Sequence, residues 1–161
     1  MSADLVNVVF AGIGGQGIIL ASDMLTEAAF KSGYDVKKSE LHGMSQRGGS
    51  VSSDVRFGTK VWSPMVPRGE ADYLVVLSED QVEVCRDMLK ENGVLLTPSI
   101  LGDYDPGRSL NIAMLGALNA HIRFPEELWI ELIRKAFKGD LAEVNIEAFR
   151  KGTSGVNQKN G

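Results

Sequence analysis

The stretch Leu5-Val-Asn-Val-Val-Phe-Ala-Gly-Ile-Gly-Gly-Gln-Gly17 decides the fold of this 161-residue chain. Leu5 to Ala11 is apolar except for Asn7, a pattern typical of a strand that is covered on both faces. Glycines at 12, 14, 15 and 17 then force a tight turn, and the apolar residues that follow recur at helical spacing. A buried strand that passes through such a turn into a helix indicates an α/β fold with a parallel sheet.

Working outward, the same patterns predict the remaining elements. The expected strands are 34–38, 51–57, 61–62, 73–77 and 94–97; the expected helices are 20–31, 78–92, 111–122, 125–138 and 141–151. The helix after residue 77 should begin with a capping box, Ser78 with Gln81, and end at Asn92-Gly93. These elements predict a doubly wound, Rossmann-like three-layer sandwich with a mainly parallel sheet and an added β-hairpin formed by 51–57 and 61–62.

Length and composition fit one globular domain over residues 1–152, followed by a disordered tail at 153–161 that is nearly free of apolar residues. No apolar run approaches the roughly 20 residues of a membrane helix. The N-terminus lacks the basic segment of a secretory signal, so we expect a cytoplasmic protein without membrane contact. Cys85 is the only cysteine, which excludes an internal disulfide and an iron–sulfur cluster ligated by cysteines of this chain alone.

Charge is unevenly distributed along the chain. The net charge is −4, yet residues 35–68 contain six Lys or Arg against three Asp or Glu. A locally basic region on an acidic protein suits an anionic ligand or partner surface, although a solvated face explains it equally well. Nucleic-acid binding is not expected because it favours a basic domain.

The glycine-rich turn offers candidate ligand-binding residues. Gly12, Gly14 and Gly17 match the G-x-G-x-x-G pattern between a strand and a helix, where backbone N–H groups can approach a phosphate. Gly15 and Gln16 complete the turn. Three interpretations remain open: a phosphate site, an NAD(P) site, or a turn that only packs the strand against its helix. The NAD(P) interpretation needs an acid after the second strand, and Glu40 meets this poorly because Lys37-Lys38 precede it.

A second polar, glycine-rich stretch, Ser39-Glu-Leu-His-Gly-Met-Ser-Gln-Arg-Gly-Gly-Ser50, carries further candidates. His42, Gln46 and Arg47, with the backbone of Gly48 and Gly49, can bring a ring, an amide and a cation around an anion. A histidine in such a loop is more often a structural hydrogen-bonding residue than a base. The residues indicate neither a catalytic side chain nor a metal ligand.

Taken together, Gly12-Ile-Gly-Gly-Gln-Gly-Ile18 and residues 39–51 make the chain resemble a known family. It is similar to the gamma-type domain of pyruvate/ketoacid (2-oxoacid):ferredoxin oxidoreductases, above all to the small subunits of the indolepyruvate enzymes. The strand Asp72-Tyr-Leu-Val-Val-Leu77 and the helix around Met114-Leu-Gly-Ala117 fit the same pattern, and the resemblance covers roughly residues 5–150.

The resemblance implies a division of labour between subunits. Family members decarboxylate a 2-oxoacid oxidatively on thiamine diphosphate with Mg, pass electrons through [4Fe–4S] clusters to ferredoxin, and transfer the acyl group to coenzyme A. The thiamine site and the clusters belong to a large partner subunit, so this chain is expected to bind none of them alone. Its implied role is to complete the complex and to receive coenzyme A or substrate at the two glycine-rich stretches. The alternative is a free-standing NAD(P)- or adenine-nucleotide-binding protein.

Overall fold

The computed structural model describes residues 4–42 and 49–160. Its elements, in chain order, are β1 (Leu5–Ile13), α1 (Ile18–Lys31), β2 (Asp35–His42), β3 (Ser50–Gly58), β4 (Ala71–Val76), α2 (Val82–Cys85), β5 (Leu89–Leu96), α3 (Leu110–Ile122), α4 (Glu126–Ala136) and α5 (Asp140–Asn160). Short 3₁₀ turns flank α2 and precede α3.

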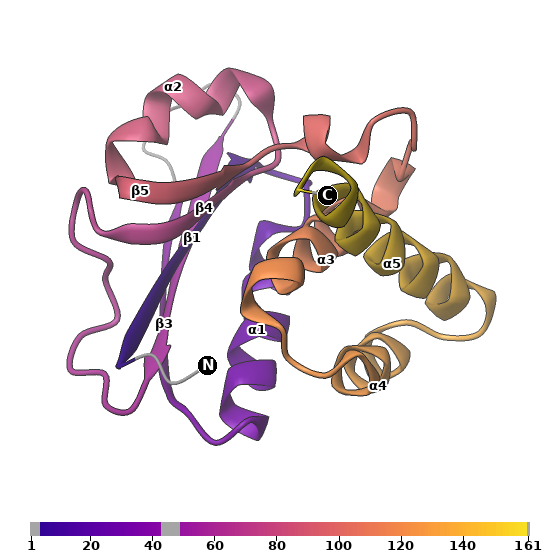
Figure 1. The fold of residues 1–161 in the computed structure, drawn as a ribbon, viewed down its shortest axis with the longest axis horizontal. Helices are drawn as coiled ribbons and strands as arrows, with labels where there is room; N and C mark the ends of the chain where they lie inside the picture. The colour runs from indigo at the N-terminus through magenta and orange to yellow at the C-terminus, as the bar shows by residue number, and fades with distance from the viewer. Residues whose placement is uncertain (1–3, 43–48, 161) are drawn as a thin grey trace.

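The five strands form one sheet in the order β2-β3-β1-β4-β5 (Figure 1). β1 pairs in parallel with β4, and β4 pairs in parallel with β5. β3 is antiparallel to both of its neighbours, β1 and β2, so four of the five strands run in the same direction. The predicted α/β class with a mainly parallel sheet is therefore confirmed.

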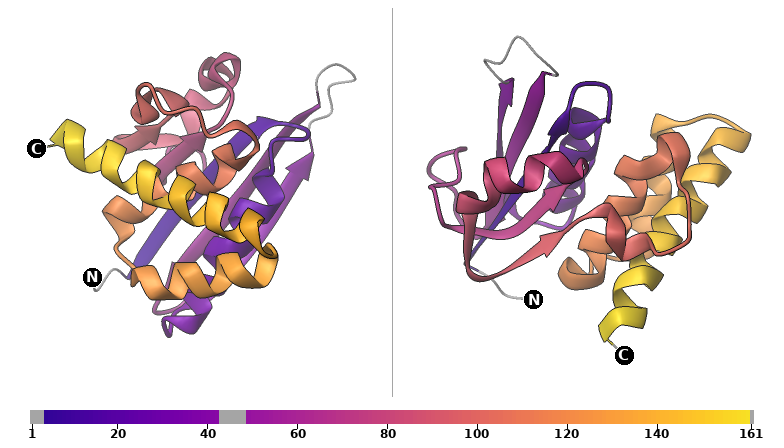
Figure 2. Two further views of the ribbon diagram at one scale, coloured as in Figure 1. Left: turned by 90° about the vertical axis from the view of Figure 1, so that its right-hand side faces the viewer. Right: turned by 90° about the horizontal axis from the view of Figure 1, so that it is seen from above.

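β1 is central because it is apolar on both faces. Val8 and Phe10 pack into the larger core, beneath α1 and α3, whereas Val9 and Ala11 face a smaller core on the other side. Figures 1 and 2 show α1, α3, α4 and α5 together on one side of the sheet, with α2 on the other. The molecule thus has three layers of unequal thickness.

The hairpin is built from a different pair of strands than predicted. β3 pairs with β2, from Asp35 opposite Gly58 to His42 opposite Val51. Polar residues are tolerated in β2 because it is an edge strand, where charged side chains are common. The prediction that 61–62 forms the second strand is wrong, since those residues lie in the loop that connects β3 to β4.

The segment after β4 also departs from the prediction. Instead of one helix to Asn92, the chain makes short helical turns between Glu79 and Met88, and β5 begins at Leu89. Asn92 and Gly93 lie within β5, and Asn92 has a φ of 69°. The pairing of β5 with β4 is irregular at this point. The predicted capping box is absent: Ser78 makes no side-chain cap, and the Gln81 side chain accepts a hydrogen bond from the Ser50 hydroxyl at 3.0 Å.

The last helix continues past the predicted stop. Gly152 was expected to end the helix before a disordered tail, but α5 extends to Asn160. Gly152 lies against the backbone of α3 near Ala113, and Thr153 donates a hydrogen bond to the Gly116 carbonyl at 2.9 Å. Val156 is buried, so residues beyond Gly152 belong to the packed structure. Within the described residues, no helix combines the length and apolar character needed to cross a membrane.

Candidate functional site

The glycine-rich turn between β1 and α1 is shaped by its own glutamine. The side-chain oxygen of Gln16 accepts a hydrogen bond from the Ile13 N–H at 2.9 Å, and its amide nitrogen donates to the Leu77 carbonyl at 3.3 Å. Gly15 and Gly17 adopt φ values of 89° and 80°, which favour glycine. Gln16, a candidate ligand-binding residue, thus has a structural role that ties the turn to the end of β4.

The two glycine-rich stretches meet at the carboxyl end of β1. The Gly14 N–H donates a hydrogen bond to the Gly49 carbonyl at 3.0 Å, across the turn. The backbone of His42 ends β2 opposite Val51. The candidates Gln46, Arg47 and Gly48, and the side chain of His42, lie outside the described residues.

The turn also contacts the start of α3, far away in sequence. The Asn111 side chain donates to the Gly17 carbonyl at 3.2 Å and accepts from the Ile112 N–H at 2.9 Å. A Cβ at Gly17 would collide with Asn111, so glycine is required there for close approach as well as for its φ. The N-termini of α1 and α3 are therefore held side by side, and both present partial positive charge.

A groove of about 560 Å³ lies between these two helix ends. It is lined by Gly15, Gln16, Gly17, Gly107, Arg108, Leu110 and Asn111. Arg108 is exposed and forms no ion pair with any residue that the structure describes. A cation beside two helix N-termini is suited to binding phosphate or carboxylate.

Sequence reasoning missed Arg108 and Asn111. Only the basic residue after Gly107, directly ahead of a predicted helix, hinted at their role. On the other flank of the turn, a smaller apolar cavity of about 280 Å³ is lined by Ile13, Ile18, Ile19, Leu20 and Val51 together with glycines of the turn. The site can thus accommodate an anion next to an apolar group.

The dinucleotide interpretation fails on the sheet topology. In a dinucleotide fold the second strand lies beside the first and in parallel, so that its terminal acid reaches the ribose. Here β3 separates β2 from β1. Glu40 is also engaged, since the Lys38 ammonium bridges Glu40 and Asp23.

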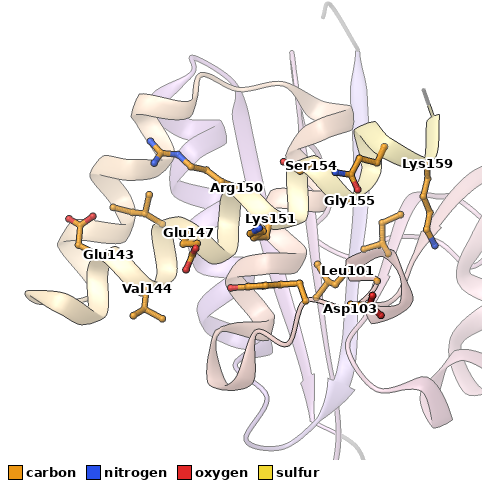
Figure 3. Close-up of a pocket in the computed structure, with 15 residues that line it drawn as sticks. Leu101, Asp103, Glu143, Val144, Glu147, Arg150, Lys151, Ser154, Gly155 and Lys159 are labelled. Carbon is orange, nitrogen blue, oxygen red and sulfur yellow. The ribbon is translucent and has the colours of Figure 1, made fainter.

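A larger groove of about 960 Å³ between α5 and the 98–105 segment is a weaker candidate (Figure 3). Its cations already have partners. The Arg150 guanidinium donates a hydrogen bond to the Glu126 carboxylate at 2.6 Å, and the Lys159 ammonium donates to the Ser99 carbonyl at 3.3 Å. Lys151 lies over the Tyr104 ring. The groove therefore presents little free charge to an anion.

Cys85 and His121 lie outside the site, and partial burial shifts the pKa of each. Burial raises the pKa of the Cys85 thiol, which donates to the Gln81 carbonyl. Burial, with a smaller contribution from Arg123, lowers the pKa of His121, whose ring packs on Tyr73. No cluster of His, Cys, Asp or Glu within 4–42 and 49–160 is arranged to hold a metal ion.

Comparison with known proteins agrees with the motifs. Residues 7–103 match the family model of pyruvate ferredoxin/flavodoxin oxidoreductase. The chain is 50% identical to indolepyruvate oxidoreductase subunit IorB of Pyrococcus horikoshii over 93 residues, 56% of this chain and 45% of that protein. The match thus spans less than half of that relative. IorB of Methanothermobacter thermautotrophicus is 34% identical over an alignment of 189 residues, which covers 91% of this chain and 95% of that protein.

Solved structures share the fold. The gamma subunit of a keto/oxoacid ferredoxin oxidoreductase from Geobacter sulfurreducens superposes with a TM-score of 0.79 at 27% identity, over 95% of this chain and 99% of that one. The 2-oxoglutarate:ferredoxin oxidoreductase of Magnetococcus marinus, with 2-oxoglutarate, coenzyme A and succinyl-CoA bound, has the same fold (TM-score 0.83, 21% identity). That match covers 98% of this chain and 32% of the longer one. The chain belongs to the pyruvate ferredoxin/flavodoxin oxidoreductase family.

Proposed function

We propose that this chain is the small subunit of a 2-oxoacid:ferredoxin oxidoreductase that acts on indolepyruvate or a related arylpyruvate. Two relatives named as indolepyruvate oxidoreductase subunits support the substrate class. A single cysteine supports the division of labour, because the electrons must pass through clusters ligated by another chain. A large partner subunit would hold thiamine diphosphate, Mg and the [4Fe–4S] clusters and would reduce ferredoxin.

Within this complex, we assign to the two glycine-rich stretches the binding of coenzyme A. The observation that carries this proposal is the Gly14–Gly49 hydrogen bond, which joins both stretches beside the groove that holds Arg108. Coenzyme A is a polyanion with a long, partly apolar arm. The neighbouring helix N-termini and Arg108 suit its phosphates, and the apolar cavity beyond Ile18 suits the arm. A fold neighbour that contains coenzyme A adds support.

The chain's contribution to the reaction is positional. Its backbone N–H groups and arginines would hold the phosphates, so that the thiol is directed toward the partner's acyl group with less loss of freedom. Gln16 fixes the turn before the ligand arrives, because both of its hydrogen bonds are made within the protein. Thiamine diphosphate, bound by the partner, would supply the carbanion chemistry.

Purification of the tagged chain from its host under anaerobic conditions tests the subunit assignment. We expect a stoichiometric large partner with iron–sulfur absorption, and dye reduction that depends on an arylpyruvate and on coenzyme A. A chain that purifies alone, or a complex that prefers pyruvate over arylpyruvates, would contradict the corresponding part of the proposal.

Two arginine substitutions test the coenzyme A site in the reconstituted complex. Arg108→Ala and Arg47→Ala should each raise the KM for coenzyme A about tenfold, because each removes a charge-assisted hydrogen bond, and should leave the KM for the 2-oxoacid unchanged. Lys138→Ala is the matched control, an exposed cation on the turn between α4 and α5. An unchanged coenzyme A requirement in both arginine variants would show that the groove is not the site.

A further inference from the structure

The loop between β3 and β4 carries Trp62, the most exposed large hydrophobic side chain among the residues that the structure describes. Trp62 is 84% exposed and Met65 is 51% exposed. Tryptophan is usually well buried, and an exposed one beside other apolar atoms is typical of a binding surface. The two valines that flank the segment, Val61 and Val66, are both buried. The loop therefore anchors its ends in the protein and directs its largest side chain outward.

Side chains of the sheet hold this loop in one conformation. The Arg56 guanidinium donates to the carbonyls of Ser63 at 3.0 Å and Met65 at 3.1 Å. The buried Asp54 carboxylate accepts from the Val66 N–H at 2.9 Å. Asp54 and Arg56 belong to β3, which lies between β2 and β1, so the loop is fixed to an interior strand of the sheet. A surface that is ordered before binding loses little conformational entropy when a partner docks.

The start of the loop is fixed in the same way. The Asp35 carboxylate accepts from the Val61 N–H at 2.8 Å, and this bond, with Lys37 and Lys60 nearby, lowers the pKa of Asp35. Asp35 is thereby engaged by the loop backbone. The tryptophan is thus displayed between two anchored parts of the loop, Val61 before it and Ser63 to Val66 after it.

The rim of the exposed tryptophan is basic. The Lys60 ammonium lies over the Trp62 ring, 5.1 Å from its centre. Lys37 is on β2, directly opposite Arg56. Neither lysine takes part in an ion pair within the described part of the chain. We call Lys37, Lys60, Trp62 and Met65 the Trp62 surface.

We infer that the Trp62 surface docks the large subunit of the oxidoreductase, through an apolar pocket on that subunit that is rimmed by carboxylates. This inference rests on the proposed function. Buried aromatic anchors surrounded by complementary charge are typical of interface hot spots. The loop lies on the side of the sheet that faces away from α1, α3, α4 and α5, because its Val66 belongs to the smaller core with Val9 of β1 and Val82 of α2. A partner can therefore approach without displacing a helix.

A second copy of this chain is a poorer occupant. A symmetric contact would place Lys37 and Lys60 against the same lysines of the other copy, which is unfavourable. A head-to-tail contact with the acidic remainder of the chain cannot fill both surfaces of a dimer and must continue into a ring or a filament. The observed charge pattern therefore favours a different, acidic chain.

The test measures binding of the intact chain to the isolated large subunit by biolayer interferometry. Trp62→Ala and Lys60→Glu should each weaken binding at least tenfold, and the Lys60→Glu variant should lose most of the salt dependence. Phe30→Ala is the control: this side chain is 70% exposed but lies on α1, across the sheet, and its loss should change the affinity less than twofold. Unchanged urea unfolding of each variant would show that the fold is intact, as expected for exposed positions.

Three results would overturn the inference. If wild type binds and Trp62→Ala binds equally well, the surface is wrong while the proposed function stands. If the wild-type chain does not bind the large subunit at all, the proposed function fails, and this inference with it. If wild type self-associates in sedimentation and Trp62→Ala is monomeric, the occupant is a second copy.

Discussion

The contact between α3 and α5 depends on glycine, and Gly152→Ala is the sharpest test of it. A methyl group at Gly152 would lie 2.8 Å from the Ala113 carbonyl carbon and 2.9 Å from the Ala117 nitrogen, with the Ala113 oxygen closer still. Ordinary contact begins near 3.4 Å, and the Ala113 oxygen is the nearest atom, so α5 must retreat from α3 by more than about 1 Å. Neither neighbour can move aside, because both are backbone atoms of a buried helix.

The expected cost follows from two opposing effects. A gap of this size forfeits a substantial part of the dispersion energy along the helix pair, and overpacking of this kind costs about 3 kcal/mol. Alanine is the better helix former by about 1 kcal/mol, which offsets part of that cost. We therefore expect a net destabilisation of about 2 kcal/mol, or a decrease in Tm of roughly 4–8 °C for a chain of this size.

Urea unfolding followed by circular dichroism provides the assay. Ser154→Ala, an exposed position on the same helix, is the control and should change stability by less than about 0.5 kcal/mol. If Gly152→Ala instead stabilises the protein by about 1 kcal/mol, then only helix propensity is at work. That result would refute the close packing of α5 on α3.

Three further outcomes are expected. Gln16→Glu should destabilise the fold by about 1–2 kcal/mol in urea unfolding at pH 7, because a carboxylate would face the Leu77 carbonyl where an amide now donates. Burial raises the pKa of Asp54, so the folded chain binds a proton at this carboxylate more readily than the unfolded chain does. The free energy of unfolding should therefore fall as pH rises from about 4. Asp54→Asn should flatten that slope in unfolding curves taken between pH 4 and 7. Burial also raises the pKa of Cys85, so the native chain should react with a disulfide reagent at pH 7 much more slowly than the urea-unfolded chain, and equal rates would contradict the buried environment.

Local sequence patterns predict individual strands and helices better than they predict which strands lie side by side in the sheet. β1, β4 and α3 were recognised because a strand or helix that is buried on all sides is apolar throughout. The position of β3 between β1 and β2 was not predictable, because strand order depends on contacts between segments that are far apart in sequence. Gly152 was misinterpreted for the same reason: a glycine that ends a helix and one that permits close packing look alike without the partner helix.

The residues of the candidate site could likewise be predicted only in part. The structure brings the two glycine-rich stretches together through Gly14 and Gly49, and their binding role stays a prediction. The role of Gln16 escaped the sequence because its acceptor, Leu77, belongs to another strand. Arg108 was not predicted because only the fold brings it beside the glycine-rich turn, and no motif surrounds it in the sequence.

The position of β1 in the sheet has a consequence for synthesis of the chain. β1 is made first, but both of its partners come later: β3 ends at Gly58 and β4 at Val76. At 5–20 residues per second, roughly 3 to 13 seconds separate the translation of Ile13 from that of Val76. During this interval a strand that is buried on both faces has no complete site to enter. Nascent β1 thus needs protection from aggregation on the ribosome until β3 and β4 have been made.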